Sequence, residues 1–134
     1  MFKTIKYRSV DKHHTGNIHV IEGSKKIKFN IKRIYFINNI QDKHTRPGHA
    51  HKNLNQIINC ISGSIKMKIF DGNKEETIIL NDPKKAIFLE NGLWRDITFL
   101  KKNTILLVIC SDIYRKSDYI RSKKKYIAWK KSNT

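Results

Sequence analysis

Residues 64–80, SIKMKIFDGNKEETIIL, decide the fold. Ile65, Met67 and Ile69 alternate with polar residues, which is the pattern of a strand with one buried face. Residues 71–73, DGN, supply turn-forming side chains, and residues 75–80 return as a second arm. This stretch therefore predicts a β-hairpin.

Short segments rich in β-branched and aromatic residues lie on both sides of this hairpin. We expect further strands at residues 18–21, 33–37, 54–61, 86–89, 94–100 and 104–111. Pro47 and Pro83 both fall in expected loops. A helix is expected only over roughly 117–131, with Ser117 or Asp118 as its cap. Many closely spaced strands with almost no helix predict an all-β fold, an antiparallel sandwich or barrel.

Length and composition are those of one folded domain. The chain has 134 residues, 39% of them hydrophobic, so we treat residues 1–134 as a single domain. Its apolar runs are shorter than a membrane-spanning helix, and its start lacks the pattern of a secretory signal. Cys60 and Cys110 lie in apolar segments, as buried free thiols do. We expect a cytoplasmic protein that binds no membrane.

The charge is strongly positive. The chain has 28 Lys and Arg against 11 Asp and Glu, a net charge of +17, which suits a nucleic-acid partner. Lysine is spread along the chain, however, and the abundant Lys, Ile and Asn all have A/T-rich codons, so genome composition is a competing cause. Neither a recognition-helix pattern nor an RNA-binding aromatic motif accompanies the charge. We expect no nucleic-acid partner, and a field that favours a small polyanion such as a nucleotide diphosphate.

One motif carries candidate chemistry: residues 46–52, RPGHAHK, followed by Gln56 and Gly63. Residues two apart on a strand share a face, so His49 and His51 point the same way. An isolated His-x-His pair is equally well explained by two exposed imidazoles. With Gln56 and Gly63 at their spacing, however, the stretch resembles the first motif of the cupin family.

The second cupin motif has a counterpart in residues 90–95, ENGLWR, which keeps Gly92. Metal-binding cupins usually carry Glu at the position of Gln56 and His at that of Arg95. A guanidinium offers no lone pair to a cation and repels it. The resemblance therefore implies a cupin jelly-roll barrel (a double-stranded β-helix) with no metal and no cofactor. Its two histidines are then free for acid–base work.

Within the cupins, the chain resembles the metal-free dTDP-sugar 3,4-ketoisomerases, the FdtA/QdtA or WxcM-like family. The matching segments keep their order and spacing from about residue 9 to 121. They are residues 31–37, 46–52, 62–64, 71–73, 93–96, 111–114 and 118–121.

This resemblance implies an isomerase that moves the ketone of dTDP-4-keto-6-deoxy-D-glucose from C4 to C3, for 3-amino-3,6-dideoxy sugars of bacterial surface glycans. It also implies a homodimer that exchanges N-terminal strands. The implied catalytic residues are His49, His51, Tyr35 and Arg46, and the implied substrate-binding residues are Arg33, Lys52, Trp94 and Arg95. The chain has Thr15 where many relatives have Arg, and Arg95 slightly favours the gluco over the galacto product.

The implied reaction needs no redox cofactor, because oxidation moves between neighbouring carbons. A base removes the C3 proton, which the C4 ketone acidifies, and a proton returns at C4. Histidine suits both steps, since its free pKa is about 6.5. We assign His51 as the main base and His49 as the group that shuttles a proton or polarises an oxygen. Arg46, Tyr35 and Arg95 are the donors available to a developing oxyanion.

Three alternatives stay open. The first is a non-catalytic cupin that binds a sugar nucleotide, and the second is a small basic barrel that binds nucleic acid. The third is a metal-dependent cupin oxygenase, which Gln56 and Arg95 disfavour.

Overall fold

The computed structural model describes residues 1–12, 14–23 and 26–134. Its strands are β1 (Phe2–Lys6), β2 (Arg8–Lys12), β3 (Gly16–Val20), β4 (Arg33–Ile37), β5 (His44–His51), β6 (Gln56–Ser62), β7 (Ile65–Phe70), β8 (Glu75–Leu80), β9 (Lys85–Leu89), β10 (Trp94–Phe99), β11 (Ile105–Cys110) and β12 (Tyr119–Ile120). A 3₁₀ turn, Lys116–Asp118, precedes β12, and helix α1 (Lys123–Ser132) follows it.

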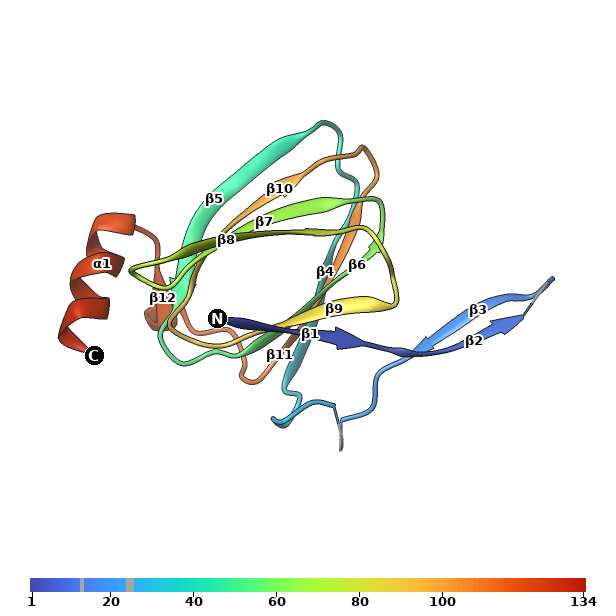
Figure 1. Ribbon diagram of the computed structural model, residues 1–134, viewed down its shortest axis with the longest axis horizontal. Helices are drawn as coiled ribbons and strands as arrows, with labels where there is room; N and C mark the ends of the chain where they lie inside the picture. Colours follow the sequence, from blue (N-terminus) through green and yellow to red (C-terminus); the bar gives the residue numbers. More distant parts are fainter. Residues whose placement is uncertain (13, 24–25) are drawn as a thin grey trace.

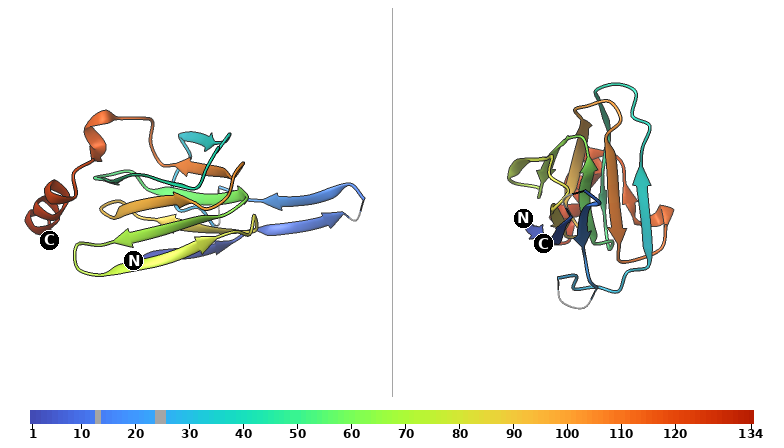
Figure 2. Two further views of the ribbon diagram at one scale, coloured as in Figure 1. Left: turned by 90° about the horizontal axis from the view of Figure 1, so that it is seen from above. Right: turned by 90° about the vertical axis from the view of Figure 1, so that its right-hand side faces the viewer.

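The strands form two layers (Figures 1 and 2). One five-stranded sheet has the order β1-β9-β6-β11-β4, and the other has the order β12-β5-β10-β7-β8. A separate pair, β2–β3, extends away from the sandwich at the end opposite α1 (Figure 1). The all-β prediction is confirmed, including the β7–β8 hairpin, whose register pairs Phe70 with Glu75. The jelly-roll strands form two separate sheets here instead of one closed barrel.

The main core lies between the two sheets. Alternation along β7 places Ile65, Met67 and Ile69 in it, all with no exposed surface. Leu106 and Val108 of β11 belong to the same cluster. Each such side chain contributes about 1.5–3 kcal/mol on burial, so this cluster fixes the spacing of the sheets. The cavity described below lies between the same sheets.

Helix α1 packs on the outer face of the second sheet. Tyr126, fully buried, contacts Trp94 and Ala50 of the sheet in a small apolar cluster. The Tyr126 hydroxyl lies 2.8 Å from the carbonyl of Gly92 and 3.1 Å from that of Phe70, and its single hydrogen is shared between these two acceptors. These contacts tie the helix to the sheet. Among the described residues, no helix is long and apolar enough to cross a membrane.

The helix begins later than the sequence predicts. It begins at Lys123, and the Ser122 hydroxyl caps it by accepting from the Lys125 N–H. The predicted cap Asp118 instead uses its carboxylate on His51 and on the backbone of Asn53. Tertiary partners thus prevail over the local capping signal, and Tyr119–Ile120 stays extended to pair with β5.

Pro47 lies in β5, and the prediction that it falls in a loop is wrong. The pairing of β5 with β10 shifts at this point, because Arg95 pairs with His49 whereas Ile97 pairs with Arg46. β5 therefore has one extra residue, a bulge in which proline's missing N–H removes no ladder bond. The bulge lies directly before the histidine pair.

Candidate active site

A cavity of ≈ 430 Å³ opens between the two sheets. Its walls combine cationic, aromatic and aliphatic side chains. They are Arg33, Tyr35, Ile37, Arg46, Pro47, His49, Gln56, Ile58, Arg95, Ile97, Leu106, Val108, Tyr114, Tyr119 and Arg121. Of the eight site residues predicted from the sequence, the structure brings five to these walls: Arg33, Tyr35, Arg46, His49 and Arg95. None of the described residues that line the cavity carries a carboxylate, so its field is positive.

His49 and Arg95 form the centre of this site. They are direct partners in the β5–β10 ladder, and both side chains line the cavity. Facing residues in such a ladder have neighbouring side chains. An imidazole and a guanidinium are therefore held side by side on rigid strands.

The Arg95 guanidinium is buried without a carboxylate partner among the described residues. The side chain is 1% exposed. Its Nη1 donates to Gln56 Oε1 at 2.7 Å and its Nη2 to the Leu93 carbonyl at 3.4 Å, while its Nε has no partner in the structure. Burial lowers the pKa of Arg95 to about 10, so the group still carries its charge at neutral pH. An unpaired buried cation is costly, and an anion in the cavity would offset that cost.

Gln56 links this guanidinium to the opposite sheet. Its amide nitrogen lies 3.5 Å from the Tyr35 hydroxyl and 3.6 Å from Cys110 Sγ. Cys110 Sγ also lies 3.7 Å from Arg33 Nη2, and both cysteines are buried free thiols as predicted. Burial raises the pKa of Tyr35, which keeps its hydroxyl protonated as a donor.

The two histidines lie at different depths. His49 lines the cavity, whereas His51 has no exposed surface and lies behind it, with the two ring centroids 4.9 Å apart. His51 Nδ1 is 3.0 Å from Asp118 Oδ2, and its Nε2 is buried without a partner in the structure. Burial, followed by the charge of Arg95, lowers the pKa of His49 to about 2 and that of His51 to about 3. Both rings are therefore neutral at physiological pH.

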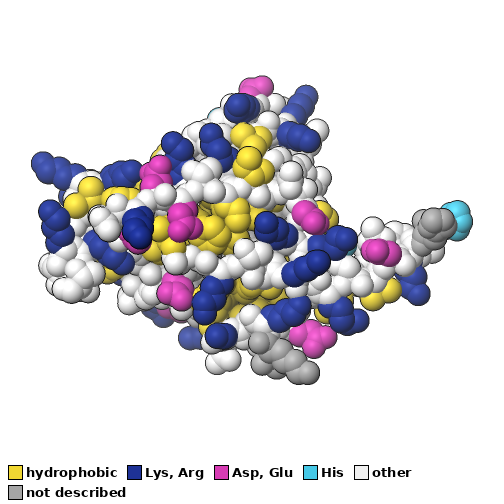
Figure 3. All heavy atoms as spheres, viewed as in Figure 1, with side chains coloured by type: hydrophobic (Ala, Val, Ile, Leu, Met, Phe, Trp, Pro, Cys, Tyr) yellow, Lys and Arg dark blue, Asp and Glu magenta, His cyan; other side chains and the backbone are white. Residues whose placement is uncertain are grey.

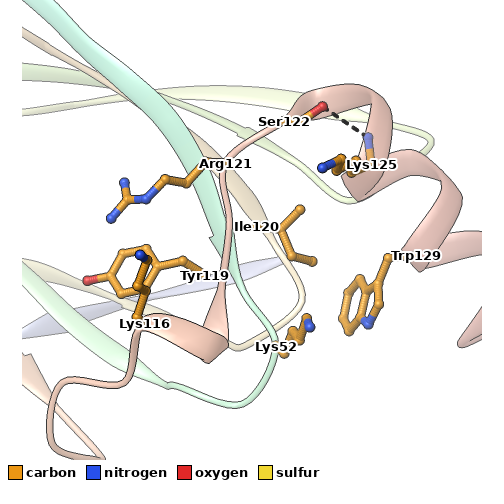
Figure 4. A pocket seen from close by; sticks show the side chains of 8 residues that line it. All are labelled: Lys52, Lys116, Tyr119, Ile120, Arg121, Ser122, Lys125 and Trp129. Atoms are coloured by element: carbon orange, nitrogen blue, oxygen red, sulfur yellow. Dashed lines mark hydrogen bonds between the residues drawn. The ribbon is translucent and has the colours of Figure 1, made fainter.

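Two predicted site residues lie elsewhere. Side chains alternate across a strand, so Trp94 points away from the cavity that Arg95 faces and packs under Tyr126. Lys52 lines a second cavity of ≈ 550 Å³ beside α1. Figure 4 shows Tyr119 and Arg121 on one side of β12, and Lys52 and Trp129 on the other.

Sequence reasoning missed several residues of the site. Tyr119 and Arg121 line both cavities, and Arg121 lies over the Tyr119 ring at 4.3 Å. The Tyr119 ring centroid is 5.3 Å from that of His49. Residues 118–121 stood among the segments that match the family, which is the signal that could have identified them.

The donor chemistry of the site suits an anion better than a metal. In the part of the chain that is described, no three His, Cys, Asp or Glu side chains cluster as a metal site would. The basic side chains on the face in Figure 3 are spread over the surface rather than gathered into one patch. Fold and site together define a small cupin-type protein whose cavity offers imidazole, phenol and guanidinium groups to a polar, anionic ligand.

Comparison with known proteins identifies the family to which this chain belongs. A sequence profile of the FdtA family, described as WxcM-like, C-terminal, matches residues 2–131. The chain is 35% identical over 116 residues to the TDP-4-oxo-6-deoxy-α-D-glucose-3,4-oxoisomerase of Aneurinibacillus thermoaerophilus, covering 84% of each chain. The chain therefore belongs to the FdtA, WxcM-like family, and the resemblance seen in the sequence is confirmed.

Solved structures agree. QdtA, a sugar 3,4-ketoisomerase from Thermoanaerobacterium thermosaccharolyticum in complex with TDP, superposes with a TM-score of 0.92 at 33% identity, over 98% of this chain and 96% of that one. WlaRB, a TDP-quinovose 3,4-ketoisomerase from Campylobacter jejuni, gives 0.88 at 31% identity, over 95% and 97%. A histidine-to-asparagine mutant of QdtA, in complex with TDP-4-keto-6-deoxyglucose, gives 0.91 at 33% identity, over 98% and 94%.

Proposed function

We propose that this protein is an isomerase that converts TDP-4-keto-6-deoxyglucose to its 3-keto isomer. The observation that carries the proposal is the pairing of the neutral His49 imidazole with the buried, uncompensated Arg95 guanidinium on one cavity wall. This pair offers a base beside a fixed positive charge, which enolate chemistry requires. The names of the relatives, all sugar 3,4-isomerases acting on TDP sugars where a nucleotide is given, point to the same reaction.

The nucleotide part of the substrate supplies negative charge to a cavity rich in cations. We assign the diphosphate to Arg33, Arg46 and Arg121, which line the cavity together with the exposed ring of Tyr114. Arginine forks bind phosphate oxygens bidentately. Lys52 lies outside this cavity, so we give it no role in holding the sugar.

His49 is the proposed base for the carbon-bound proton, in place of His51, because only His49 reaches the cavity wall. It removes the proton from C3, the electron pair forms the C3–C4 double bond, and the C4 ketone oxygen becomes an enolate oxygen. His49 then returns a proton to C4. The C3 hydroxyl loses its proton as its oxygen becomes the ketone, and the C4 oxygen gains one, so atoms and electrons balance.

The negative charge of the bound diphosphate raises the pKa of His49. In the free protein the Arg95 charge helps to lower the pKa of His49. A bound diphosphate offsets the positive field, and an opposite charge nearby raises the pKa of an imidazole. The base therefore becomes stronger when the substrate is bound.

Arg95 and Tyr35 are the proposed donors to the enolate oxygen. Arg95 lies on the cavity wall with an unpartnered Nε, and Tyr35 remains protonated. A preorganised donor of this kind contributes typically 10²–10³-fold in rate. We further propose the gluco configuration at C4 of the product, and its use in 3-amino-3,6-dideoxy sugars of a surface glycan, made in the cytoplasm.

The proposal is tested by incubating the purified protein with TDP-4-keto-6-deoxyglucose and recording ¹³C spectra of the sugar. We expect the ketone resonance to move from C4 to C3, and the C4 proton coupling of the product to give its configuration. Tight binding with an unchanged sugar spectrum would favour the non-catalytic alternative. A protein that neither binds nor converts this sugar nucleotide would overturn the proposal.

We also propose a homodimer with exchanged N-terminal strands. The β2–β3 hairpin extends beyond the sandwich (Figure 1) and pairs with neither sheet, as an element seated on a second copy would. Ile34 and Phe36 on the edge strand β4 are 57% and 64% exposed, and a partner strand would cover them. Light scattering after gel filtration should give twice the mass of the chain, and deletion of residues 8–20 should give a monomer.

A further inference from the structure

Asp118 connects His51 to the backbone at the end of β5. Its Oδ2 lies 3.0 Å from His51 Nδ1, and its Oδ1 accepts from the Asn53 N–H at 2.7 Å. Its carbonyl accepts from the Lys52 N–H at 2.9 Å. The side chain is 10% exposed, so both carboxylate oxygens are used inside the protein.

These contacts determine the tautomer of His51. A carboxylate only accepts hydrogen bonds, so Nδ1 must carry the hydrogen that faces Oδ2. In the neutral ring, Nε2 is then a lone-pair acceptor. That atom is buried and has no partner among the described residues, and a buried acceptor without a partner costs about 1–3 kcal/mol.

The orphaned acceptor lies close to the reacting groups. The His51 ring centroid is 4.9 Å from that of His49 and 4.4 Å from that of Tyr119. The reaction moves an oxygen-bound proton from the C3 oxygen to the C4 oxygen as well as a carbon-bound one. A second neutral acceptor beside His49 suits that transfer.

We propose that Asp118 is a positioning residue for the isomerase reaction: it holds His51 as the Nδ1–H tautomer, so that Nε2 accepts the hydroxyl proton of the sugar through Tyr119, which lies between His51 and the cavity. This inference rests on the proposed function. In chemical terms, the Tyr119 hydroxyl takes the proton from the C3 hydroxyl as the C3 ketone forms and gives its own proton to His51 Nε2. The reverse transfer, from Nε2 to Tyr119 and from Tyr119 to the sugar, delivers a proton to the C4 oxygen. His49 meanwhile moves the carbon-bound proton.

Asp118→Asn tests this proposal without removing the hydrogen bond from the Asn53 N–H to the side chain of residue 118. An asparagine has one acceptor oxygen, and the Asn53 N–H must keep it, because an amide NH₂ there would place two donors face to face. The NH₂ group then faces His51 Nδ1 and donates to it, which forces the Nε2–H tautomer. The variant therefore preserves the contact with the Asn53 backbone, while His51 Nε2 carries a hydrogen and no longer accepts a proton.

We expect Asp118→Asn to fold with a melting temperature near that of the wild type and to lose at least 100-fold in kcat with little change in KM, since a wrong tautomer is severely damaging. Asp112→Asn is the matched control: Asp112 is an aspartate on the same segment whose carboxylate pairs with Arg115, and it should retain activity. With His51→Asn already present, Asp118→Asn should cost nothing further.

Two-bond ¹H–¹⁵N spectra of the histidine rings give a readout that a merely structural role would not move. We expect Nδ1–H for His51 in the wild type and Nε2–H in Asp118→Asn. The Nε2–H tautomer of His51 in the active wild type would overturn the inference. So would the Nε2–H tautomer in Asp118→Asn together with a kcat within threefold of the wild-type value. A wild-type protein with the Nδ1–H ring but no ketone migration would instead overturn the proposed function. The wild-type spectrum decides the tautomer even if the variant fails to fold.

Discussion

Gln56→Glu replaces one atom, the amide nitrogen, of the side chain that holds Arg95. The amide oxygen of Gln56 lies 2.7 Å from Arg95 Nη1, so a glutamate in the same rotamer would place a carboxylate against the buried guanidinium. With the charge centres about 4 Å apart and an effective dielectric of ~20, their attraction is about 4 kcal/mol. Desolvation of the new carboxylate consumes part of this. We expect the free energy of unfolding to rise by about 1–2 kcal/mol.

Activity should change in the opposite direction. A carboxylate at residue 56 neutralises Arg95, so the enolate oxygen loses its fixed positive charge, and kcat should fall by about 10²–10³-fold. The assay is ketone migration followed by NMR, beside urea denaturation of the same preparation. EDTA is included, because His49, His51 and the new carboxylate together resemble a metal site. A variant that keeps its kcat, or that loses both stability and activity, would refute the reasoning.

Three further predictions concern stability. The pKa values of His49 and His51 are lowered in the folded state, so between about pH 6.5 and 3 the unfolded chain binds more protons than the folded one. The free energy of unfolding therefore falls with falling pH in this range. His49→Gln should reduce that slope by about 1.4 kcal/mol per pH unit, measured by urea denaturation at stepped pH. A Cβ on Gly48 would lie 2.7 Å from Trp94 Cζ2, so Gly48→Ala should lose about 1–3 kcal/mol by thermal melting, and an unchanged melting temperature would show that the indole moves freely. Tyr126→Phe removes the hydrogen bonds that tie α1 to the second sheet and should cost about 1–3 kcal/mol with kcat retained; loss of kcat would mean that the helix shapes the cavity.

The strands were the most predictable part of the fold. Observed β4 and β8 have the predicted bounds, 33–37 and 75–80, because the branched and aromatic residues of the first and the turn before the second are local signals. The strand β1 was missed because Phe2–Lys6, FKTIK, does not alternate between apolar and polar residues. The helix start was misplaced because Asp118, a good local cap, has a stronger use on a distant strand.

The sequence predicted which residues form the site better than it predicted what each of them does. His49 and His51 share a face, as the period of a strand requires, but their depths depend on the bulge at Pro47 and on the Asp118 contact. Neither follows from spacing. Trp94 was assigned to the substrate together with Arg95, although spacing could have excluded it, since the neighbour of an inward-facing Arg95 must point outward. Residues such as Arg121, far along the chain, reach the cavity only through tertiary packing.

The account depends on a single imidazole at the cavity wall that carries a proton between two sugar carbons. The most direct test follows TDP-4-keto-6-deoxyglucose in deuterium oxide by proton NMR, with the wild-type protein and with His49→Gln. We expect the wild type to move the ketone to C3, with solvent deuterium on C4 to the extent that the proton held by His49 exchanges before it is returned. His49→Gln should leave both the ketone and the C3 proton in place. Ketone migration at an undiminished rate in His49→Gln would contradict the account.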